Sequence, residues 1–388
     1  MTGASPLTIG VVAGEASGDL LGAHLIKALR TRLPQAHFIG IGGPRMQSAG
    51  MEVLYPMEKL AVRGYVEVLR HYTEILGIRR RLAARFLRQP PALFVGVDAP
   101  DFNLGLEEKL RSAGIPTAHL VSPSIWAWRG GRIGKIGRAV ERMLVIFPFE
   151  REIYEKAGIP VTYVGHPLAE MLASSPDRSA AREQLRLPAA AKVVVLLPGS
   201  RLSEVGEMAD TFIETARQIA ATVPDAHFLV PLVNRSTRDL FETALYRREA
   251  GELNLTILFG HAHEAMAAAD VVLAASGTAT LEAALIGRPV VIAYRMPRVS
   301  WWIMSHRRYQ PYVGLPNILA GEFVVPEFLQ DEATPENLSQ AVLNLLFDGA
   351  VRARLEARFA AIASELRQDS AGLIASALVP MIRTHPAT

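Results

Sequence analysis

The chain has 388 residues, of which 50% are apolar and 20% charged, with no cysteine and a net charge of +3. This length exceeds one ordinary hydrophobic core and predicts two folded domains. The absence of cysteine excludes disulfides, thiolate catalysis and thiolate metal sites, and so small a net charge gives no argument for nucleic-acid binding. No apolar run reaches the roughly 18–20 residues that cross a bilayer, and the first residues do not resemble a signal peptide, so a cytoplasmic protein is expected.

The first half of the chain predicts a parallel sheet, because short continuous apolar runs alternate with helical stretches. Strands are expected at Thr8–Ala13, His37–Ile41, Leu93–Val97, Thr117–Val121, Met143–Ile146 and Val161–Val164. Helices fit between them, for example over Asp19–Arg32 and Phe102–Ala113. Such sheets bind ligands outside the carboxyl ends of their strands, so the turns at those ends are the first places to look for chemistry.

The first of these turns is Gly14-Glu15-Ala16-Ser17-Gly18-Asp19. It resembles a phosphate-binding turn, but it lacks the glycine spacing of dinucleotide-binding proteins, and its two acids would repel a pyrophosphate. Two interpretations stay open: the turn binds sugar hydroxyls, or Ser17 or Asp19 caps the following helix.

The segment from Lys59 to Arg88 is strongly basic, with seven arginines opposed only by Glu67 and Glu74. A set of apolar residues near one helical face interrupts it: Val62, Val66, Leu69 and Leu76. A basic helix with an apolar stripe can lie among the headgroups of an anionic membrane. It can also be a surface helix that packs its stripe on its own domain, and the pattern by itself favours this second interpretation.

The strand at Leu93–Val97 runs into Asp98-Ala99-Pro100-Asp101-Phe102-Asn103. Asp101 stands where a helix N-cap belongs and is expected to be structural. Asp98 lies at the strand end before a stiff Ala-Pro step, where no cap is needed. A general base would stand at this position, so Asp98 is the candidate base.

A second domain is expected after Pro167–Ala191, a stretch with Ser-Ser-Pro-Asp and an Ala-rich run that predicts a linker or hinge. Strands follow at Val193–Leu197, His227–Val230, Thr256–Phe259, Val271–Ala274 and Val290–Tyr294, and the tail from Pro335 is expected to be helical. Two such domains in tandem predict a bilobal protein with its active site in the cleft between the lobes.

Two turns of the second domain suit a diphosphate. In Pro198-Gly199-Ser200-Arg201, glycine lets the backbone approach a ligand and arginine offers a bidentate charge. In Ser276-Gly277-Thr278, a helix begins without bulky side chains, so its N–H groups can meet an anion. Thr278 and Thr280 offer hydroxyl groups, and Glu282 can accept hydrogen bonds from a sugar diol. The alternative is an ordinary strand–helix–strand unit with a solvated Glu282.

Metal chemistry is not expected, since the chain contains no Asp-x-Asp, the pattern with which many glycosyltransferases hold a divalent ion. It also contains no Gly-x-Ser-x-Gly and no Walker A sequence. His261 and His263 are spaced as on one side of a strand, without a third ligand nearby in the sequence.

The tryptophans form two pairs, Trp126/Trp128 and Trp301/Trp302. The second pair opens a stretch of mixed aromatic and basic residues, which fits a membrane interface or a lipid phosphate, or equally a buried aromatic cluster between the lobes.

Together these stretches resemble the lipid-A-disaccharide synthase family of bacterial glycosyltransferases. The likeness rests on Gly14–Asp19, Gly42-Gly43-Pro44-Arg45-Met46, Asp98–Asn103, Ser122-Pro123-Ser124-Ile125-Trp126-Ala127-Trp128-Arg129, Leu197–Arg201, Gly165-His166-Pro167, Ser276–Glu282 and Leu315-Pro316-Asn317. These stretches span nearly the whole chain, and the one with two tryptophans is the most specific to the family.

The resemblance implies an α/β protein of two Rossmann-like, doubly wound domains facing across a cleft, the GT-B fold. It implies an inverting, metal-independent transferase without a cofactor. Such an enzyme joins UDP-2,3-diacylglucosamine to the 6-hydroxyl of 2,3-diacylglucosamine 1-phosphate (lipid X), which yields UDP and a β-1,6-linked disaccharide.

The resemblance also assigns roles to residues. Asp98 is the expected base, and Glu15 and Ser17 are expected on the acceptor side. The expected donor-side residues are Gly199, Ser200, Arg201, Ser276, Gly277, Thr278, Glu282 and Asn317. Because both substrates carry acyl chains, Val66, Leu69 and Leu76 are now expected to contact an anionic lipid surface, on the inner face of the inner membrane.

The expected domains are an acceptor-binding, membrane-facing domain over residues 1–170, a UDP-sugar domain over 190–345 and a helical tail over 346–388. Whether the chain forms a homodimer stays open. Two rival functions suit the same scaffold. A UDP-N-acetylglucosamine 2-epimerase would not need the basic, apolar segment, and a nucleotide-sugar sensor without enzymatic activity would not need Asp98.

Overall fold

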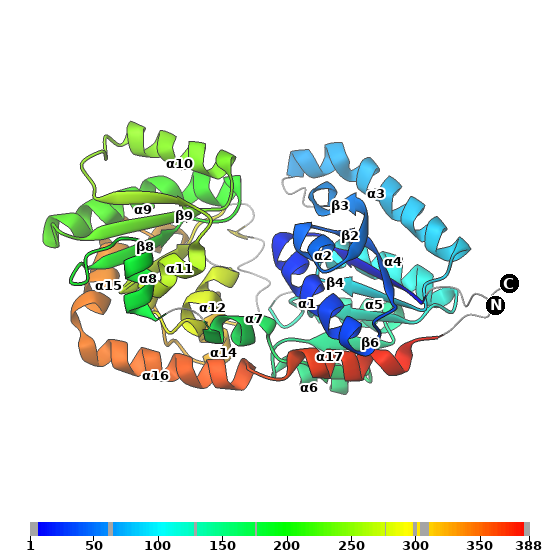
Figure 1. Cartoon of the computed structure of the whole chain (residues 1–388). Helices are drawn as coiled ribbons and strands as arrows, with labels where there is room; N and C mark the ends of the chain where they lie inside the picture. The colour runs from blue at the N-terminus through cyan, green and yellow to red at the C-terminus, as the bar shows by residue number, and fades with distance from the viewer. Residues whose placement is uncertain are drawn as a thin grey trace. The chain divides into compact units, whose positions relative to one another are not determined.

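A computed structural model of the chain describes residues 7–60, 65–127, 130–174, 177–275, 277–297, 301–302 and 310–383, with the backbone alone for 65–72 and 174. Contacts divide the chain into two compact units, coloured in chain order in Figure 1. Unit 1 comprises Met1–Pro167 and Leu366–Thr388, and unit 2 comprises Leu168–Glu365. The end of the chain therefore belongs to unit 1, whereas the sequence predicts a separate tail from residue 346.

Unit 1 is built on seven parallel strands in the order β3-β2-β1-β4-β5-β6-β7. Their bounds are β1 Thr8–Ala13, β2 His37–Gly42, β3 Met51–Pro56, β4 Leu93–Val97, β5 Thr117–Leu120, β6 Arg142–Val145 and β7 Val161–Tyr163. Six of them agree with the prediction to within one residue at each end. The sequence misses β3, because this edge strand is only partly buried and lacks a continuous apolar run.

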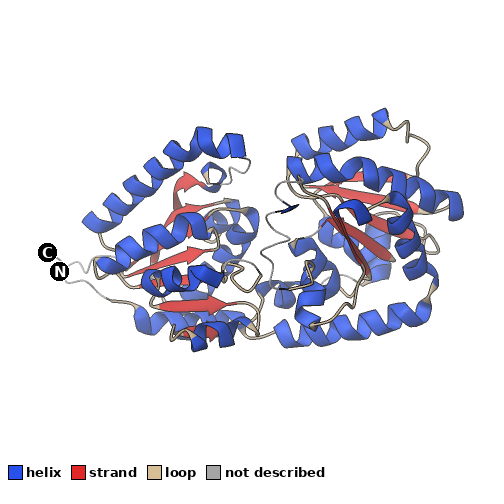
Figure 2. Ribbon diagram, turned by 180° about the vertical axis from the view of Figure 1, so that it is seen from behind, coloured by secondary structure: helices blue, strands red, loops and turns tan. Residues whose placement is uncertain are grey.

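Helices cover both faces of this sheet, as its buried central strands require (Figure 2). They are α1 Ala16–Arg32, α2 Pro44–Ser48, α3 Tyr65–Arg88, α4 Pro100–Ser112, α5 Ile133–Ala139, α6 Glu150–Lys156 and α17 Ser370–Leu378, with short 3-10 turns η1 Met57–Lys59, η2 Gly130–Arg132 and η5 Val379–Met381. α1 packs against α17, and α4 packs against α3 and α5. The last helix of the chain thus covers the first.

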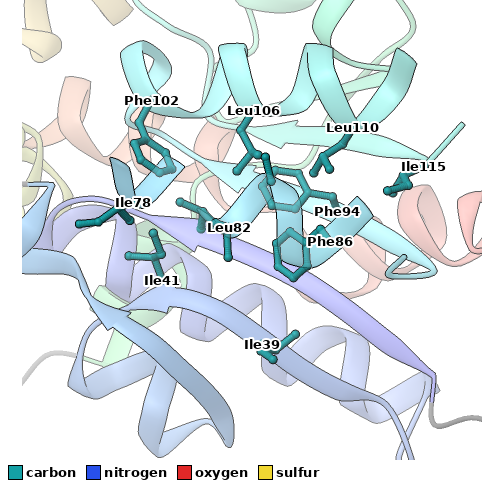
Figure 3. Packing of buried hydrophobic residues seen from close by; sticks show 12 residues of the cluster. Ile39, Ile41, Ile78, Leu82, Phe86, Phe94, Phe102, Leu106, Leu110 and Ile115 are labelled. Carbon is teal, nitrogen blue, oxygen red and sulfur yellow. The ribbon is translucent and has the colours of Figure 1, made fainter. Parts of the chain in front are cut away.

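The space between α3, α4 and the sheet is filled by large apolar side chains (Figure 3). The cluster includes Ile39, Ile41, Ile78, Leu82, Phe86, Phe94, Phe102, Leu106, Leu110 and Ile115. The members from α4 recur every four residues and so form one helical face. This packing fixes α4 on the sheet, and with it the turn that leads from β4 into α4.

Unit 2 is built on six parallel strands in the order β10-β9-β8-β11-β12-β13. Their bounds are β8 Val193–Leu197, β9 His227–Leu232, β10 Leu255–Phe259, β11 Val271–Ala275, β12 Val290–Tyr294 and β13 Glu327–Leu329. Five of them were expected within two residues of these bounds. The sixth, β13, is a three-residue, half-buried edge strand that leaves no pattern in the sequence.

The helices that follow Pro167 are α7 Pro167–Met171, η3 Leu172–Ser174, α8 Arg178–Gln184, α9 Leu202–Thr222, α10 Arg235–Arg247, α11 Ala262–Ala268, α12 Thr278–Leu285, α14 Leu315–Ala320, η4 Gln330–Glu332, α15 Pro335–Phe347 and α16 Gly349–Leu366. The expectation of a linker throughout Pro167–Ala191 is wrong, since α7 and α8 lie within it. Arg182 of α8 is buried, and its Nη2 donates to Asp270 Oδ2 at 2.9 Å. α8 is therefore anchored in unit 2.

The predicted fold class, two doubly wound parallel α/β domains, is confirmed by these two sheets. Within the described ranges, no helix combines the length and the apolarity needed to cross a bilayer.

Candidate active site

In unit 1, two turns with candidate chemistry lie side by side. β1 and β4 are hydrogen-bonded neighbours, so the turns that follow them share the carboxyl edge of the sheet. The turns approach closely at Gly14, where a Cβ atom would lie 2.9 Å from the Cβ of Ala99. The structure therefore brings Glu15 and Ser17 to the same edge as Asp98.

Asp98 occupies a strained turn. It and Ala99 both adopt left-handed backbone conformations, with φ of 50° and 44°. Such conformations cost non-glycine residues on the order of 1–3 kcal/mol each and are concentrated at functional sites. The Asp98 N–H donates to the carbonyl of Leu120 at 2.9 Å, and Asn103 Nδ2 donates to the carbonyl of Asp98 at 2.8 Å. The carboxylate itself is partly exposed.

Asp101 is not the predicted N-cap of α4. Ala99 holds that position, and Asp101 lies within the first turn, where its charge suits the helix dipole. Its side chain is 80% exposed and lies 2.5 Å from Arg132 Nη2. This helix therefore begins at Pro100 without a side-chain cap.

Asp19 does not cap its own helix either, because Glu15 is the N-cap of α1. Asp19 is buried and accepts hydrogen bonds from the N–H groups of Gly43, Arg45 and Met46 at 2.9, 3.0 and 3.0 Å. It thereby caps the neighbouring helix α2. Glu15 remains the acid of this turn that reaches the surface.

Trp126 belongs to an aromatic cluster at the next strand ends of unit 1. Its ring lies edge-on to Phe149 with centroids 5.3 Å apart, and its Nε1 donates to Glu150 Oε1 at 3.0 Å. Burial raises the pKa of Glu150 to about 8, although hydrogen bonds from Phe147 N–H and Trp126 oppose that shift. Burial also lowers the pKa of His166, which packs on Phe147, to about 4. Trp126 thus packs into an aromatic cluster of unit 1, while Trp128 lies outside the described residues.

In unit 2, the two turns predicted for a diphosphate also share an edge. β8 and β11 are paired neighbours, and each ends in a glycine turn. Gly199 and Gly277 have φ of 137° and 138°, which side-chain-bearing residues rarely adopt. The structure therefore brings together two stretches that are far apart in the sequence.

Arg201 is the N-cap of α9 and pairs with a carboxylate three residues later. Its Nη1 lies 2.6 Å from Glu204 Oε1, and its side chain is 40% exposed. Glu204 Oε2 accepts hydrogen bonds from the N–H groups of Ser200 at 2.9 Å and Arg201 at 3.2 Å. A carboxylate of the chain thus occupies two N–H groups of a turn at which the sequence predicts a diphosphate.

Gly277 is the N-cap of α12, and both Gly277 and Thr278 are exposed. Thr280 is fully buried, and its hydroxyl donates to the carbonyl of Gly277 at 2.8 Å. The expectation that Thr280 offers its hydroxyl to a ligand is therefore wrong. Ser276, predicted at the same turn, lies outside the described residues.

Glu282 is not a solvated acid. His263 Nε2 lies 3.0 Å from Glu282 Oε2, and the Glu282 side chain is 18% exposed. His261 is the N-cap of α11 and His263 lies inside that helix, so their expected placement on a strand is wrong. Among the described residues, no group of three or more His, Asp or Glu side chains is arranged to hold a metal ion.

Asn317 is fully buried in α14. Its Nδ2 donates to Val325 O at 2.9 Å and to Glu327 Oε1 at 2.7 Å, and its Oδ1 accepts from the N–H groups of Val324 and Val325. Glu327 also accepts from the N–H of Gly314 at 2.8 Å. Asn317 therefore shapes the loop around α14 through contacts within the chain. Its predicted contact with the donor stays a prediction.

α3 buries an apolar stripe other than the predicted one. Ile78, Leu82 and Phe86 enter the core described above. Leu76 lies outside that cluster and is only partly buried, and Leu87, eleven positions later on the same side, is 37% exposed. Residues 66 and 69 lie in the stretch described by its backbone alone. The membrane contact of the predicted stripe stays a prediction.

Comparison with known proteins finds relatives over nearly the whole chain. A profile of the lipid-A-disaccharide synthetase family matches residues 9–377. The chain is 56% identical over 376 residues to the lipid-A-disaccharide synthase of Methylobacillus flagellatus, covering 97% of this chain and 100% of that protein. It is 57% identical over 378 residues to that of Aromatoleum aromaticum, covering 97% of both.

Solved structures of much lower identity share the fold. The UDP-GlcNAc 2-epimerase of Neisseria meningitidis, bound to UDP-GlcNAc, matches with a TM-score of 0.61 at 11% identity over 96% of this chain and 98% of that one. MurG of Acinetobacter baumannii matches with a TM-score of 0.56 at 15% identity over 97% and 99%. These likenesses identify the GT-B fold and nothing more. The family profile and the relatives above 50% identity decide the rest: the chain belongs to the lipid-A-disaccharide synthase family of glycosyltransferases.

Proposed function

We propose that the protein transfers 2,3-diacylglucosamine from UDP to the 6-hydroxyl of lipid X, with inversion at the anomeric carbon and without a metal ion. Family membership supports the substrates. The observation that carries the mechanism is the strained turn that presents Asp98 at the carboxyl edge of β4, beside the Gly14 turn. The proposal requires that unit 1 bind the acceptor and unit 2 the donor.

Asp98 acts as the base. The attacking hydroxyl must lose its proton as its oxygen bonds to the anomeric carbon, and a partly exposed carboxylate at a strand end can take that proton. The C–O bond to UDP breaks in the same step, and its electron pair leaves with the diphosphate. Glu15 and Ser17, at the neighbouring turn, bind the acceptor.

Arg201 and the N-terminus of α12 stabilise the leaving diphosphate. Exposed backbone at Gly277 and Thr278 begins a helix of 8 residues, where the helix dipole favours an anion. Arg201 adds a full positive charge on the neighbouring strand end. Together they supply the charge that a metal ion would otherwise provide.

Glu282 binds the ribose. One oxygen of its carboxylate lies 3.0 Å from His263 Nε2. The second oxygen has no hydrogen bond to another described residue and can accept one from a diol. A fixed carboxylate loses less conformational entropy on binding than a solvated one.

The outward side of α3 contacts the membrane that holds both lipid substrates, on the inner face of the inner membrane. Leu76, Arg80 and Leu87 recur at spacings of four and seven, away from the core stripe, and residue 69 precedes Leu76 by seven. An apolar stripe beside arginines is the pattern of a helix that lies in the headgroup region.

The direct test is an assay with UDP-2,3-diacylglucosamine and lipid X in EDTA, following UDP release and disaccharide formation. We expect both products in equal amounts. UDP release without a disaccharide, or activity that returns only with added Mg²⁺, would contradict the proposal. Conversion of UDP-GlcNAc alone to an epimer would instead favour the rival isomerase activity.

A further inference from the structure

A fully buried polar cluster lies beneath the turn that carries Asp98. Asn103, Glu107 and His119 are each 0% exposed. Asn103 and Glu107 stand one turn apart on α4, and His119 lies on β5. Side chains of these types are seldom fully buried, and the proposed function does not use them so far.

The contact between Glu107 and His119 is possible because position 96 is a glycine. His119 stands opposite Gly96 in the pairing of β5 with β4. Glu107 reaches across this glycine, and its Oε1 lies 2.7 Å from His119 Nδ1. A Cβ atom at position 96 would lie 2.1 Å from the same Oε1. The bare strand at Gly96 therefore creates the space that the charged pair fills.

The backbone carbonyl and N–H of Asp98 are hydrogen-bonded to α4 and β5, the two elements that carry this cluster. Asn103 Nδ2 donates to the Asp98 carbonyl at 2.8 Å and to Val12 O of β1 at 3.2 Å. The Asp98 N–H donates at 2.9 Å to Leu120, the residue after His119. A shift of α4 or β5 at the cluster would therefore move Asp98.

The cluster is costly as a purely structural device. Three of its buried atoms have no hydrogen-bond partner among the residues that the structure describes: Asn103 Oδ1, Glu107 Oε2 and His119 Nε2. Buried polar atoms without partners reduce stability, and apolar side chains of similar size in place of a buried charged pair are often neutral or stabilising. Stability alone therefore does not account for the cluster.

The Asp98 carboxylate also acts on this cluster electrostatically. Burial by itself lowers the pKa of His119, but the charge and hydrogen bond of Glu107, together with the charge of Asp98, raise it overall. His119 thus lies in the field of two carboxylates, and Asp98 is one of them.

We propose that Asn103, Glu107 and His119 are positioning residues for Asp98, which hold its turn in the left-handed conformation. The inference rests on the proposed role of Asp98 as the base. During transfer, the proton still passes from the acceptor hydroxyl to Asp98, and the cluster exchanges no atom with the substrate.

The test uses the double variant Glu107→Leu/His119→Phe in the full chain. We expect its Tm to equal or exceed that of the wild type, its Kd for UDP to be unchanged and its kcat to fall by roughly ten- to a hundredfold, the effect of a small misplacement of a reacting group. Thr117→Val is the matched control. It removes a buried hydrogen bond of the same strand, from Thr117 to Ala139 O at 2.8 Å, and should lower Tm but leave kcat unchanged.

Glu107→Gln serves if the double variant fails to fold, since it keeps the shape of the pair and removes its charge. It should lower kcat and shift the pH profile of kcat in the wild type, and it should lower kcat no further in an Asp98→Asn background. Two results would overturn the positioning role. One is a kcat and a pH profile in these variants that equal those of the wild type. The other is an equal loss of kcat on Glu107→Gln in the wild type and in the Asp98→Asn background. If Asp98→Asn alone has the turnover of the wild type, Asp98 is not the base, and the cluster then positions no base.

Discussion

Arg201 and Glu204 form an ion pair at the first turn of α9, with Arg201 Nη1 2.6 Å from Glu204 Oε1. The pair stands where the proposed function puts the donor diphosphate. A diphosphate and Glu204 are therefore alternative partners for the same guanidinium and for the N–H groups of Ser200 and Arg201. This relationship makes two substitutions informative, because they should move UDP affinity in opposite directions.

Arg201→Ala should weaken UDP binding. A charged hydrogen bond contributes about 1.5–3 kcal/mol, roughly ten- to a hundredfold in Kd, and the half-exposed position favours the lower end. Glu204→Gln should tighten binding, since it weakens the competing partner. Isothermal titration of UDP measures both. Arg235→Ala, at an arginine 91% exposed on α10, is the control and should bind UDP as the wild type does. Equal UDP affinity in the wild type and all three variants would show that Arg201 does not bind the diphosphate.

Glu282→Gln should weaken UDP binding about tenfold through the loss of a charged acceptor for the ribose. It should affect a 2′,3′-dideoxy analogue of UDP much less, because that ligand has no diol. Glu264→Gln is the control on the neighbouring helix, where Glu264 lies 3.6 Å from His261. An equal loss of affinity for both nucleotides would show that Glu282 acts on some other part of the ligand.

Glu150 should make stability depend on pH. Its pKa in the folded protein is about 8 against 4.5 in the unfolded chain, so the folded state binds more protons between these values and stability falls as pH rises. His166, with its pKa lowered to about 4, opposes this trend only below its ordinary value of 6.5. Thermal melts between about pH 6.5 and 8 should therefore show Tm falling more steeply in the wild type than in Glu150→Gln. Parallel slopes would contradict a buried, protonated Glu150.

Replacement of Val66, Leu69 and Leu76 by serine should release the protein from anionic vesicles. Its Tm should stay nearly unchanged, because the described core residues of α3 include Ile78, Leu82 and Phe86 and leave Leu76 outside. Binding should also fall with salt, since roughly 1 kcal/mol per basic residue near the surface is electrostatic and screened. Vesicle flotation beside a thermal melt measures both effects. Ile78→Ser is the comparison, since Ile78 is 2% exposed, and it should lower Tm sharply. A triple variant that unfolds but still floats would place the stripe in the core.

The strands were predictable because burial on both faces of a parallel sheet leaves continuous apolar runs, as in Val193–Leu197. β3 was missed because this strand is only partly buried and has no continuous apolar run. Residue types at strand ends also led to Asp98 and to the Gly199 turn, since ligands bind at carboxyl edges whatever the sequence between them.

Side-chain partners were less predictable, because tertiary approach decides them. Asp19 caps a helix that begins 25 residues later, and Thr280 bonds within its own turn. Nothing in the sequence pairs Glu107 with His119, since helix and strand register align them only after folding. The one available signal was Gly96 inside a buried apolar strand, which marks a place where something approaches the backbone closely.

The turnover of Asp98→Asn tests the central claim most directly, measured with UDP-2,3-diacylglucosamine and lipid X. The account predicts a kcat lower by roughly 10²- to 10⁴-fold, the usual contribution of a general base, with unchanged Tm and UDP affinity. Asp101→Asn, three residues away and 80% exposed, should retain nearly full turnover. Asp98→Asn with the turnover of the wild type would contradict the account.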